Sequence, residues 1–294
     1  MIKNSKVAII IVNWKKYNMT ANCVESVIKC NYPNYEIILV DNESDTSKVS
    51  IFKSRKNLKT ILNSKNEGFS KANNQGIEYA LKNNFDYILL LNNDTVIKSN
   101  LIDILIKTLQ AKKVYAIQPL ILNHKRKKIW SGGGKINYFF GTFSSSKKAC
   151  NSFKLIEWFT GCCCLFDSKL FIDIGKFDER FFAYYEDVDF SLRMKKNGYK
   201  IGFTPQTELI HMESASSKLE TNKEGVLSPN VHYLNIKNHI FVLRKHSKIF
   251  NPIGTVFYQI FKIFSYTTYF ILRFRFTKLR MVYKGLKDSF KTQI

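Results

Sequence analysis

Short apolar runs and helical apolar patterns alternate along the first ninety or so residues of the chain. Four runs have the length and aliphatic content of strands that are buried on both faces; they cover residues 7–12, 35–40, 58–63 and 87–91. Apolar residues at helical spacing fill two of the intervals, at 19–29 and 69–84. Alternation of strands and helices at this spacing predicts βαβ units and a parallel sheet, which is an α/β fold.

Polar residues follow each of the four predicted strands. The chain continues into Asn13 and Trp14, into "DNES" at 41–44, into "NSKNEGF" at 63–69 and into "NND" at 92–94. In an open parallel sheet, ligands bind in the crevice outside the carboxyl ends of the strands. We therefore expect one binding site at these loops, although any single loop is equally consistent with an Asx-turn or a helix cap.

A second group of acids stands in "YYEDVDF" at 184–190. Glu186, Asp187 and Asp189 are candidates for a general base, because a carboxylate can take the proton of an attacking hydroxyl. The same acids begin the predicted helix "VDFSLRMKKNG", which Gly198 ends, and negative charge is favourable at a helix N-terminus. The catalytic and the helix-stabilising roles both remain open here.

Composition and charge narrow the class of partner. The 294 residues are 45% apolar and 14% aromatic, a composition that supports a substantial core. Lys and Arg number 46 against 23 Asp and Glu, and the net charge of +23 favours nucleic acid, an anionic membrane or phosphorylated small molecules. The excess is concentrated at residues 231–294, which contain 12 Lys or Arg and one acid, Asp288.

Aromatic and aliphatic residues interleave with the basic residues of this C-terminal segment. The window Ile253–Leu272 contains one Lys and several Ser, Thr and Tyr. Such a window is weak as a spanning helix and is more typical of an amphipathic helix in the membrane interface. The alternative is a helical cap on the preceding domain with a solvated basic face.

Three further segments bear on location and local structure. The six cysteines have no paired spacing, and Cys162–Cys164 are adjacent, which suits a small-residue buried strand better than a disulfide framework or a zinc site. The first apolar run has six residues before Asn13, too short for a signal-peptide core, so we expect a cytoplasmic location. Residues 130–146, "WSGGGKINYFFGTFSSS", are interpreted as a mobile loop on the acceptor side.

An ordered series of motifs runs from about residue 6 to 245. It consists of "VAIIIVNW", "ILVDNES", "NEGFSKANNQGI", "YILLLNNDTVI", "WFTGCCCLFDSKLFIDIGKFDERFFAYYEDVDFSLRMKKNGYKI" and "ELIHMESAS". Together these motifs resemble glycosyltransferase family 2, in particular its rhamnosyltransferase-like branch. The resemblance implies a GT-A fold, with a mixed, mainly parallel sheet and flanking helices over residues 1–230. Its donor half would cover about 1–120 and its acceptor half about 121–230, before basic, amphipathic helices at 231–294.

The resemblance also implies an activity and its site residues. The reaction would be an inverting transfer from dTDP-rhamnose or a UDP-sugar to a hydroxyl of a polysaccharide or a lipid-linked oligosaccharide. The donor-binding positions would be Asn13, Asp41, Ser44, Asn66, Gly68, Asn73 and Asn92. Asp41 would hydrogen-bond the base, with Asn13 and Ser44 beside it. The family often has an acid two positions after that Ser, whereas here Asp45 follows it directly.

"NND" occupies the place of the family's Asp-x-Asp motif, so Asp94 would ligate Mg²⁺ or Mn²⁺ bridging the two donor phosphates. Asn92 would lie near the ribose or a metal-bound water. His211 would be a further metal ligand, although a lone His is as often a hydrogen-bonded or surface residue. Asp187, in the family's Glu-Asp pair, would be the catalytic base.

Two other function classes compete with an enzyme. A nucleic-acid-binding protein would explain the charge, but no recognised motif is present and the basic excess lies beside apolar helical segments. A non-catalytic, membrane-associated scaffold could keep the fold and lose the acids, whereas Asp41, Asp94 and Asp187 are all present. We therefore expect a transferase that lies peripherally on the inner face of the cell membrane, bound to its anionic surface through the C-terminal segment, with no nucleic-acid partner.

Overall fold

The computed structural model describes residues 5–52, 55–124, 128–212 and 226–294. The chain divides into two compact units. The first comprises Met1–Lys135, Ser145–Glu179 and Glu186–Glu213, and the second Ile136–Ser144, Arg180–Tyr185 and Ser214–Ile294. The second unit thus combines the C-terminal helices with two short segments that leave and re-enter the first unit.

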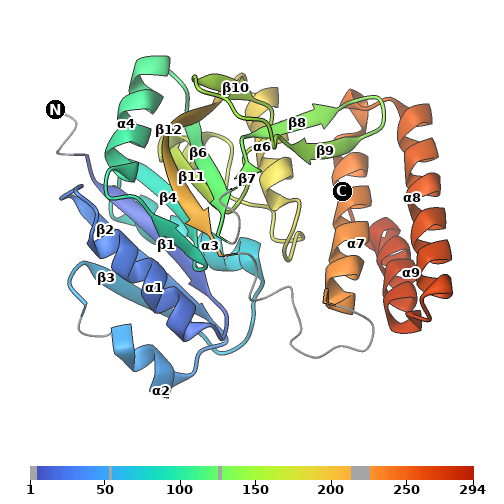
Figure 1. The fold of residues 1–294 in the computed structure, drawn as a ribbon, viewed down its shortest axis with the longest axis horizontal. Coiled ribbons are helices and arrows are strands. Elements are labelled where there is room, and N and C mark those ends of the chain that lie inside the picture. The colour runs from blue at the N-terminus through green and yellow to red at the C-terminus, as the bar shows by residue number, and fades with distance from the viewer. Residues whose placement is uncertain (1–4, 53–54, 125–127, 213–225) are drawn as a thin grey trace. The chain divides into compact units, whose positions relative to one another are not determined.

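The first unit is built on a mixed, mainly parallel sheet (Figure 1), which has ten strands within the described residues. The strands are β1 (Val7–Asn13), β2 (Tyr35–Asn42), β3 (Leu58–Asn63), β4 (Tyr87–Asn92), β5 (Thr95–Ile97), β6 (Ala116–Asn123), β7 (Ile129–Ser131), β10 (Lys154–Ile156), β11 (Cys163–Asp167) and β12 (Ile201–His211). Their order is β10-β12-β6-β11-β4-β1-β2-β3, with β5 on β12 and β7 on β6. The four strands predicted from apolar runs are β1 to β4, and they pair in parallel.

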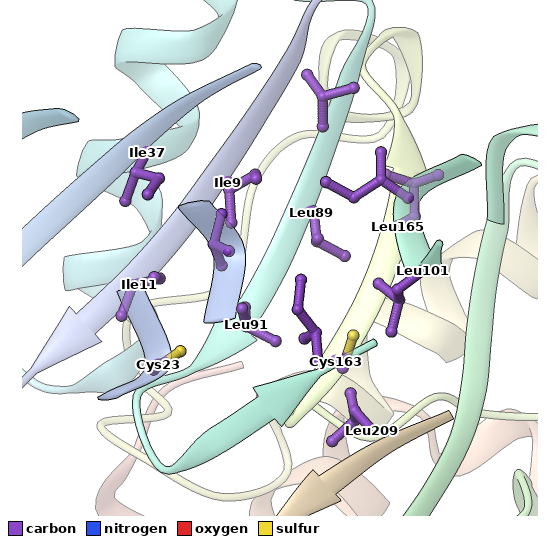
Figure 2. Packing of buried hydrophobic residues seen from close by; sticks show 14 of the residues in the cluster. Ile9, Ile11, Cys23, Ile37, Leu89, Leu91, Leu101, Cys163, Leu165 and Leu209 are labelled. Atoms are coloured by element: carbon purple, nitrogen blue, oxygen red, sulfur yellow. The ribbon is translucent and has the colours of Figure 1, made fainter. Parts of the chain in front are cut away.

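Helices lie between these strands, including the two that apolar spacing predicts at 19–29 and 69–84. They are α1 (Tyr17–Ile28), α2 (Thr46–Val49), α3 (Phe69–Lys82), α4 (Leu101–Lys112), α5 (Lys169–Asp173) and α6 (Glu186–Lys196), with a 3₁₀ turn at Ser50–Phe52. Two apolar clusters fill the two faces of the sheet, and successive residues of β1 alternate between them. Figure 2 shows Ile9, Ile11, Leu89, Leu91, Cys163 and Leu165 in one cluster. Burial on both faces explains why these strands are continuously apolar.

The register of the sheet brings the polar strand ends to one edge. Asn13 lies opposite Asp41, and Asn42 lies opposite Asn63 on the next strand. On the other side of β1, Val12 lies opposite Asn92. The carboxyl ends of the four predicted strands therefore meet side by side.

The glycine-rich segment expected to be a mobile loop is mostly strand, so that interpretation is wrong. Residue Ser131 ends β7, and β8 (Gly134–Asn137) pairs with β9 (Thr142–Ser145) as a two-stranded sheet. At Gly134 a Cβ atom would lie 2.4 Å from the ring of Trp158, and the backbone forms a bridge to that residue. The glycine permits this close approach of two backbones.

Three helices make up most of the described residues of the second unit. Its helices are α7 (Pro229–Lys245), α8 (Pro252–Leu272) and α9 (Phe276–Lys291), with a 3₁₀ turn at Ser247–Ile249. Ile236 and Ile240 of α7 pack with Phe270 of α8 and Val282 of α9. Within the described ranges, no helix combines the length and apolar character needed to cross a membrane.

Candidate active site

Asp41 stands at the end of β2, fully buried, at the centre of a hydrogen-bond network. Its Oδ1 accepts a hydrogen bond from Asn13 Nδ2 at 2.6 Å, and its Oδ2 accepts one from the Tyr17 hydroxyl at 3.0 Å. Asn13 Oδ1 in turn accepts from Thr20 Oγ1 at 2.7 Å. Asn93 Nδ2, from the loop after β4, donates to the same Thr20 oxygen at 2.9 Å. The structure therefore brings Asn13 and Asp41, two residues predicted to bind the sugar donor, into direct contact.

Tyr17 is a site residue that sequence reasoning missed. Besides donating to Asp41, its hydroxyl accepts a hydrogen bond from the backbone N–H of Asp45 at 2.8 Å. Burial, and the nearby Asp41 carboxylate, raise the pKa of this phenol. Tyr17 thus connects the start of α1 to the loop after β2, and only its place just after the first strand end marks it in the sequence.

Short-range hydrogen bonds hold the loop after β2. Ser44 Oγ donates to the carbonyl of Asp41 at 2.9 Å, and Asp45 caps α2 by accepting from Ser47 N. Ser44, a predicted donor contact, is therefore held as a turn residue beside Asp41.

The ends of β2 and β3 form a second network, made of side-chain amides. Asn42 Nδ2 donates to Asn66 Oδ1 at 2.8 Å, and Asn66 Oδ1 also accepts from Gly68 N at 3.0 Å. Asn63 and Gln75 exchange two hydrogen bonds of 2.8 Å each. Asn42, Asn63 and Gln75 were not predicted, although "DNES" and "NSKNEGF" contain the first two.

Gly68 and Asn73 belong to the start of α3. Gly68 has a φ of +90°, a conformation that glycine adopts without strain, immediately before the helix. Asn73 is almost fully buried, and its Nδ2 donates to the carbonyl of Phe69 at 2.8 Å. The positive φ of Gly68 therefore sets the backbone at the turn into α3, whereas the amide group of Asn73 donates within its own helix.

The "NND" loop places Asp94 next to His211. Asp94 Oδ1 lies 3.2 Å from His211 Nε2, and both side chains are more than nine-tenths buried. The pairing of β5 with β12, which sets Thr95 opposite His211, brings the two residues together. The two residues that sequence reasoning assigned to a metal, 117 positions apart in the chain, are thus neighbours in the fold.

The Asp94–His211 pair fits a cation that takes only part of its coordination from the protein. Within the described ranges, no group of three or more His, Cys, Asp or Glu is arranged to hold a metal. Mg²⁺ commonly binds one or two carboxylates and completes its shell with water and substrate phosphates, which an acid and an imidazole at a strand edge allow. The ring of Trp130 packs edge-on against His211, with centroids 4.6 Å apart, and so holds the imidazole in place.

Asp187 lies in the first turn of α6 with both carboxylate oxygens on backbone donors. Oδ2 accepts from Gly161 N at 3.0 Å and Oδ1 from Val188 N at 2.8 Å. Burial raises the pKa of Asp187 to about 6, although these N–H groups oppose the shift. A general base is most effective when its pKa lies near the working pH, so this carboxyl group is suited to that role.

The other acids of this cluster occupy different surroundings. Asp189 is fully buried, and its Oδ2 accepts from Arg193 Nε at 3.0 Å. Arg193 also donates to the carbonyls of Ile174 and Lys176, at 2.7 and 2.6 Å. Asp189 therefore anchors a loop, while Glu186, also buried, begins the helix.

A short segment connects Asp187 to the "NND" loop. Gly161 donates its N–H to Asp187, and the next residue, Cys162, accepts the N–H of Asn92 through its carbonyl at 2.9 Å. Cys162, Cys163 and Cys164 are buried, as expected, and burial raises the pKa values of their thiols. The predicted base and the predicted metal loop thus border the same turn at the start of β11.

Comparison with known proteins identifies the family. A model of the "Glycosyltransferase like family 2" matches residues 4–224. A low-salt glycan biosynthesis hexosyltransferase, Agl10 of Haloferax volcanii, is 28% identical over 208 residues, which are 69% of this chain and 66%, just under two thirds, of that protein. The dTDP-rhamnosyl transferase RfbF of Shigella flexneri is 22% identical over 253 residues, 83% of this chain and 81% of RfbF.

The fold has known counterparts as well. The crystal structure of GalNAc-T7 with UDP, GalNAc and Mn²⁺ superposes with a TM-score of 0.64 at 18% identity, over 82% of this chain and 48% of that one. This likeness establishes the GT-A fold expected from the motifs. Since the family model covers well over half of the residues, the chain belongs to the glycosyltransferase-like family 2.

Proposed function

We propose that this glycosyltransferase is an inverting, metal-dependent hexosyltransferase. It would move a sugar from dTDP-rhamnose or a UDP-sugar to a hydroxyl of a polysaccharide or a lipid-linked oligosaccharide. The observation that carries the proposal is the contiguity of three parts at one sheet edge: the Asp41 network, the Asp94–His211 pair and Asp187. The names of the related hexosyl- and rhamnosyltransferases support the type of sugar.

The donor would lie along the carboxyl ends of β1 to β4. Asn13, Asp41 and Ser44 would face the base, with Tyr17 holding the Asp41 carboxylate in place. The amide network that includes Asn66, and the backbone at Gly68, would lie along the nucleotide, with Asn73 nearby on α3 and Asn92 near the ribose. The network matters because buried amides that are already hydrogen-bonded need no reordering when the ligand arrives.

Asp94 and His211 would hold Mg²⁺ or Mn²⁺ at this edge. When bound, the cation neutralises the charge that develops on the departing nucleoside diphosphate. His211 Nε2 and Asp94 Oδ1 already face each other, so the protein would supply these two metal ligands without rearranging a strand.

Asp187 would act on the acceptor. As the acceptor oxygen forms its bond to the anomeric carbon and the bond to the diphosphate breaks on the opposite face, the carboxylate takes the hydroxyl proton. This single displacement inverts the anomeric configuration. The hydrogen bonds from Gly161 and Val188 hold the carboxylate in one orientation for that transfer.

With a lipid-linked acceptor, the reaction would take place at the inner face of the cell membrane, with the basic segment 231–294 at its anionic surface. A nucleic-acid ligand is not part of the proposal, because the acids and amides of the site are suited to a cation and a nucleotide sugar. A non-catalytic scaffold is disfavoured because Asp41, Asp94 and Asp187 are all present, whereas a scaffold could lose these acids.

A donor panel tests the proposal. Thermal shift with dTDP-, UDP- and GDP-sugars, each with Mg²⁺ or Mn²⁺ and again with EDTA, should show one nucleotide class that stabilises the protein only with metal. Asp94→Asn should abolish this shift, whereas the matched change Asp103→Asn, in the first turn of α4, should leave it intact. The metal role of Asp94 would be refuted if the donor stabilised the wild-type protein fully in EDTA and stabilised the Asp94→Asn variant to the same extent. A product with retained anomeric configuration would refute the displacement mechanism.

A further inference from the structure

Helix α8 exposes a row of large apolar side chains along one side. Its exposed large side chains over the first three turns recur at helical spacing, with no polar residue among them. They are Ile253, Val256, Phe257, Ile260, Phe261 and Phe264, and they are 58 to 79% exposed. We call these six residues the outer face of α8. A helix of a water-exposed domain normally shows the opposite arrangement, with its apolar stripe toward the core.

Three polar residues of the same helix, Thr255, Gln259 and Lys262, point inward. Thr255 Oγ1 and both amide atoms of Gln259 are buried. Lys262 Nζ lies 2.7 Å from His239 Nδ1 of α7, and burial lowers the pKa of this lysine to about 8. His239 Nε2 lies 2.7 Å from the carbonyl of Gly141, which can only accept, so Nε2 carries the proton and Nδ1 accepts from the ammonium group.

The packing of its inner side therefore fixes the orientation of α8 about its own axis. Turning the helix to bury its outer face would break the Lys262–His239 contact and remove Phe270 from its cluster with Ile236 of α7 and Val282 of α9. The inner side of α8 is thus packed against α7 and α9, which lie beside it in Figure 1. The outer face is left to contact something outside the unit.

Basic and aromatic residues are also exposed on the α8–α9 turn and on α9. The turn between α8 and α9 exposes Leu272, Arg273 and Phe274. Exposed aromatic and basic residues also occur together along α9; they are Phe276, Arg280, Tyr283, Lys284, Lys287, Phe290 and Lys291. Large apolar side chains beside Lys and Arg are typical of helices that lie at the surface of an anionic bilayer.

We propose that the outer face of α8 is a membrane-docking surface. It lies in the plane of an anionic lipid bilayer, with Phe257, Phe261 and Phe264 among the acyl chains. The exposed Arg and Lys of α9 and of the α8–α9 turn contact the headgroups. In-plane helices of this kind insert their apolar side by about 5–10 Å. The inward-facing, packed side of α8 excludes the alternative in which lipid surrounds the helix.

A bilayer fits this surface better than a second copy of the chain. Residues 231–294 carry a net charge of +11, from 12 Lys or Arg and one acid. A twofold interface between two such surfaces would bring like charges together, whereas an anionic bilayer attracts them. This inference deepens the peripheral attachment in the proposed function by naming the contact surface and its orientation, and it rests on that function only for the choice of a lipid-linked acceptor.

Vesicle co-sedimentation tests the surface directly. The full chain should sediment with vesicles of phosphatidylglycerol and phosphatidylcholine, and much less with phosphatidylcholine alone. Phe257→Ser with Phe261→Ser should weaken binding about tenfold or more, because two inserted rings are lost. The matched control is Leu155→Ser with Ile172→Ser, which changes two apolar residues of the first unit that are 55% and 70% exposed. It should bind like wild type.

Two further measurements separate insertion from charge attraction. Phe261→Trp should gain fluorescence quenching by brominated lipids relative to wild type, whose Trp14, Trp130 and Trp158 all lie in the first unit. Arg280→Gln with Lys284→Gln and Lys287→Gln should reduce the component that 1 M salt removes, where the screening length is about 3 Å. The thermal shift induced by the nucleotide-sugar donor should be unchanged in every variant. Because the vesicle and quenching measurements do not depend on donor binding, failure of the proposed glycosyltransferase function would not change their outcome.

Three outcomes would overturn the inference. The first is vesicle binding that the double serine variant leaves at the wild-type level. The second is an absence of Phe261→Trp quenching with vesicles that do bind the protein. The third is a concentration-dependent dimer, seen by sedimentation velocity without lipid, that the double serine variant dissociates while vesicle binding persists. That third result would assign the outer face of α8 to a second copy of the chain.

Discussion

Replacing Asp187 by Asn separates catalytic from structural roles in the acidic cluster. Asn keeps the shape of the side chain and can still accept the Gly161 N–H, but it has no basicity. We expect donor binding to survive and turnover to fall by about 10²- to 10⁴-fold, the usual range for loss of a general base. In the wild type, kcat/KM should fall on the acidic side with an apparent pKa near 6, because the base must be ionised.

The same substitution should stabilise the protein at neutral pH. The pKa of Asp187 is raised from 3.8 to about 6, so the native state binds the proton more tightly than the unfolded chain does. The free energy of unfolding therefore falls as the pH rises from about 4 to 6, and it stays lower at higher pH. At 1.4 kcal/mol per pKa unit, the decrease is at most about 3 kcal/mol. Because Asn has only one acceptor oxygen for the Gly161 and Val188 N–H groups, about 1–2 kcal/mol of this gain is offset. We therefore expect a net gain of about 1 kcal/mol for Asp187→Asn at pH 7.5 and a net loss of about 1–2 kcal/mol near pH 4.

Asp189→Asn is the matched comparison, since it changes an acid two residues further along α6. It breaks a buried ion pair with Arg193 and should cost about 2 kcal/mol or more. The acidic limb of its pH–rate profile should stay near pH 6. Urea unfolding at pH 4 and 7.5, with pH–rate profiles of each variant, measures both effects. If the stability of Asp187→Asn relative to wild type does not rise between pH 4 and pH 7.5, or if the variant keeps full turnover, the assignment of Asp187 as a buried base is wrong.

Two other substitutions probe contacts that the structure adds to the site. Tyr17→Phe removes the hydroxyl that joins Asp41 to the Asp45 N–H, so KM for the donor should rise several-fold at nearly constant kcat, with a loss of stability of about 1 kcal/mol; an unchanged KM in steady-state assays would leave Tyr17 outside the donor site. Gly134→Ala places a Cβ atom 2.4 Å from the Trp158 ring and should cost about 1–3 kcal/mol in chemical unfolding; a variant as stable as wild type would contradict the close backbone approach.

The pattern of apolar residues determined much of the first unit. Continuous aliphatic runs predict strands covered on both faces, and β1 to β4 are such strands, with polar residues at their carboxyl ends. Because parallel neighbours end at the same edge, the approximate location of the site follows from the order of elements. The motifs predicted the family and the GT-A fold, and both are confirmed.

The tertiary structure alone decided which polar groups meet and in what surroundings. Asp187 and Asp189 look equivalent in sequence, yet one receives backbone N–H groups at a raised pKa while the other pairs with Arg193. The composition of residues 130–146 suggested a loop because it could not reveal that the ring of Trp158 packs against Gly134. Likewise, apolar spacing in α8 predicts an amphipathic helix but not which side faces its neighbours. Local patterns record the preference of each residue, whereas pairing, burial and pKa depend on groups that are distant in the chain and become neighbours only on folding.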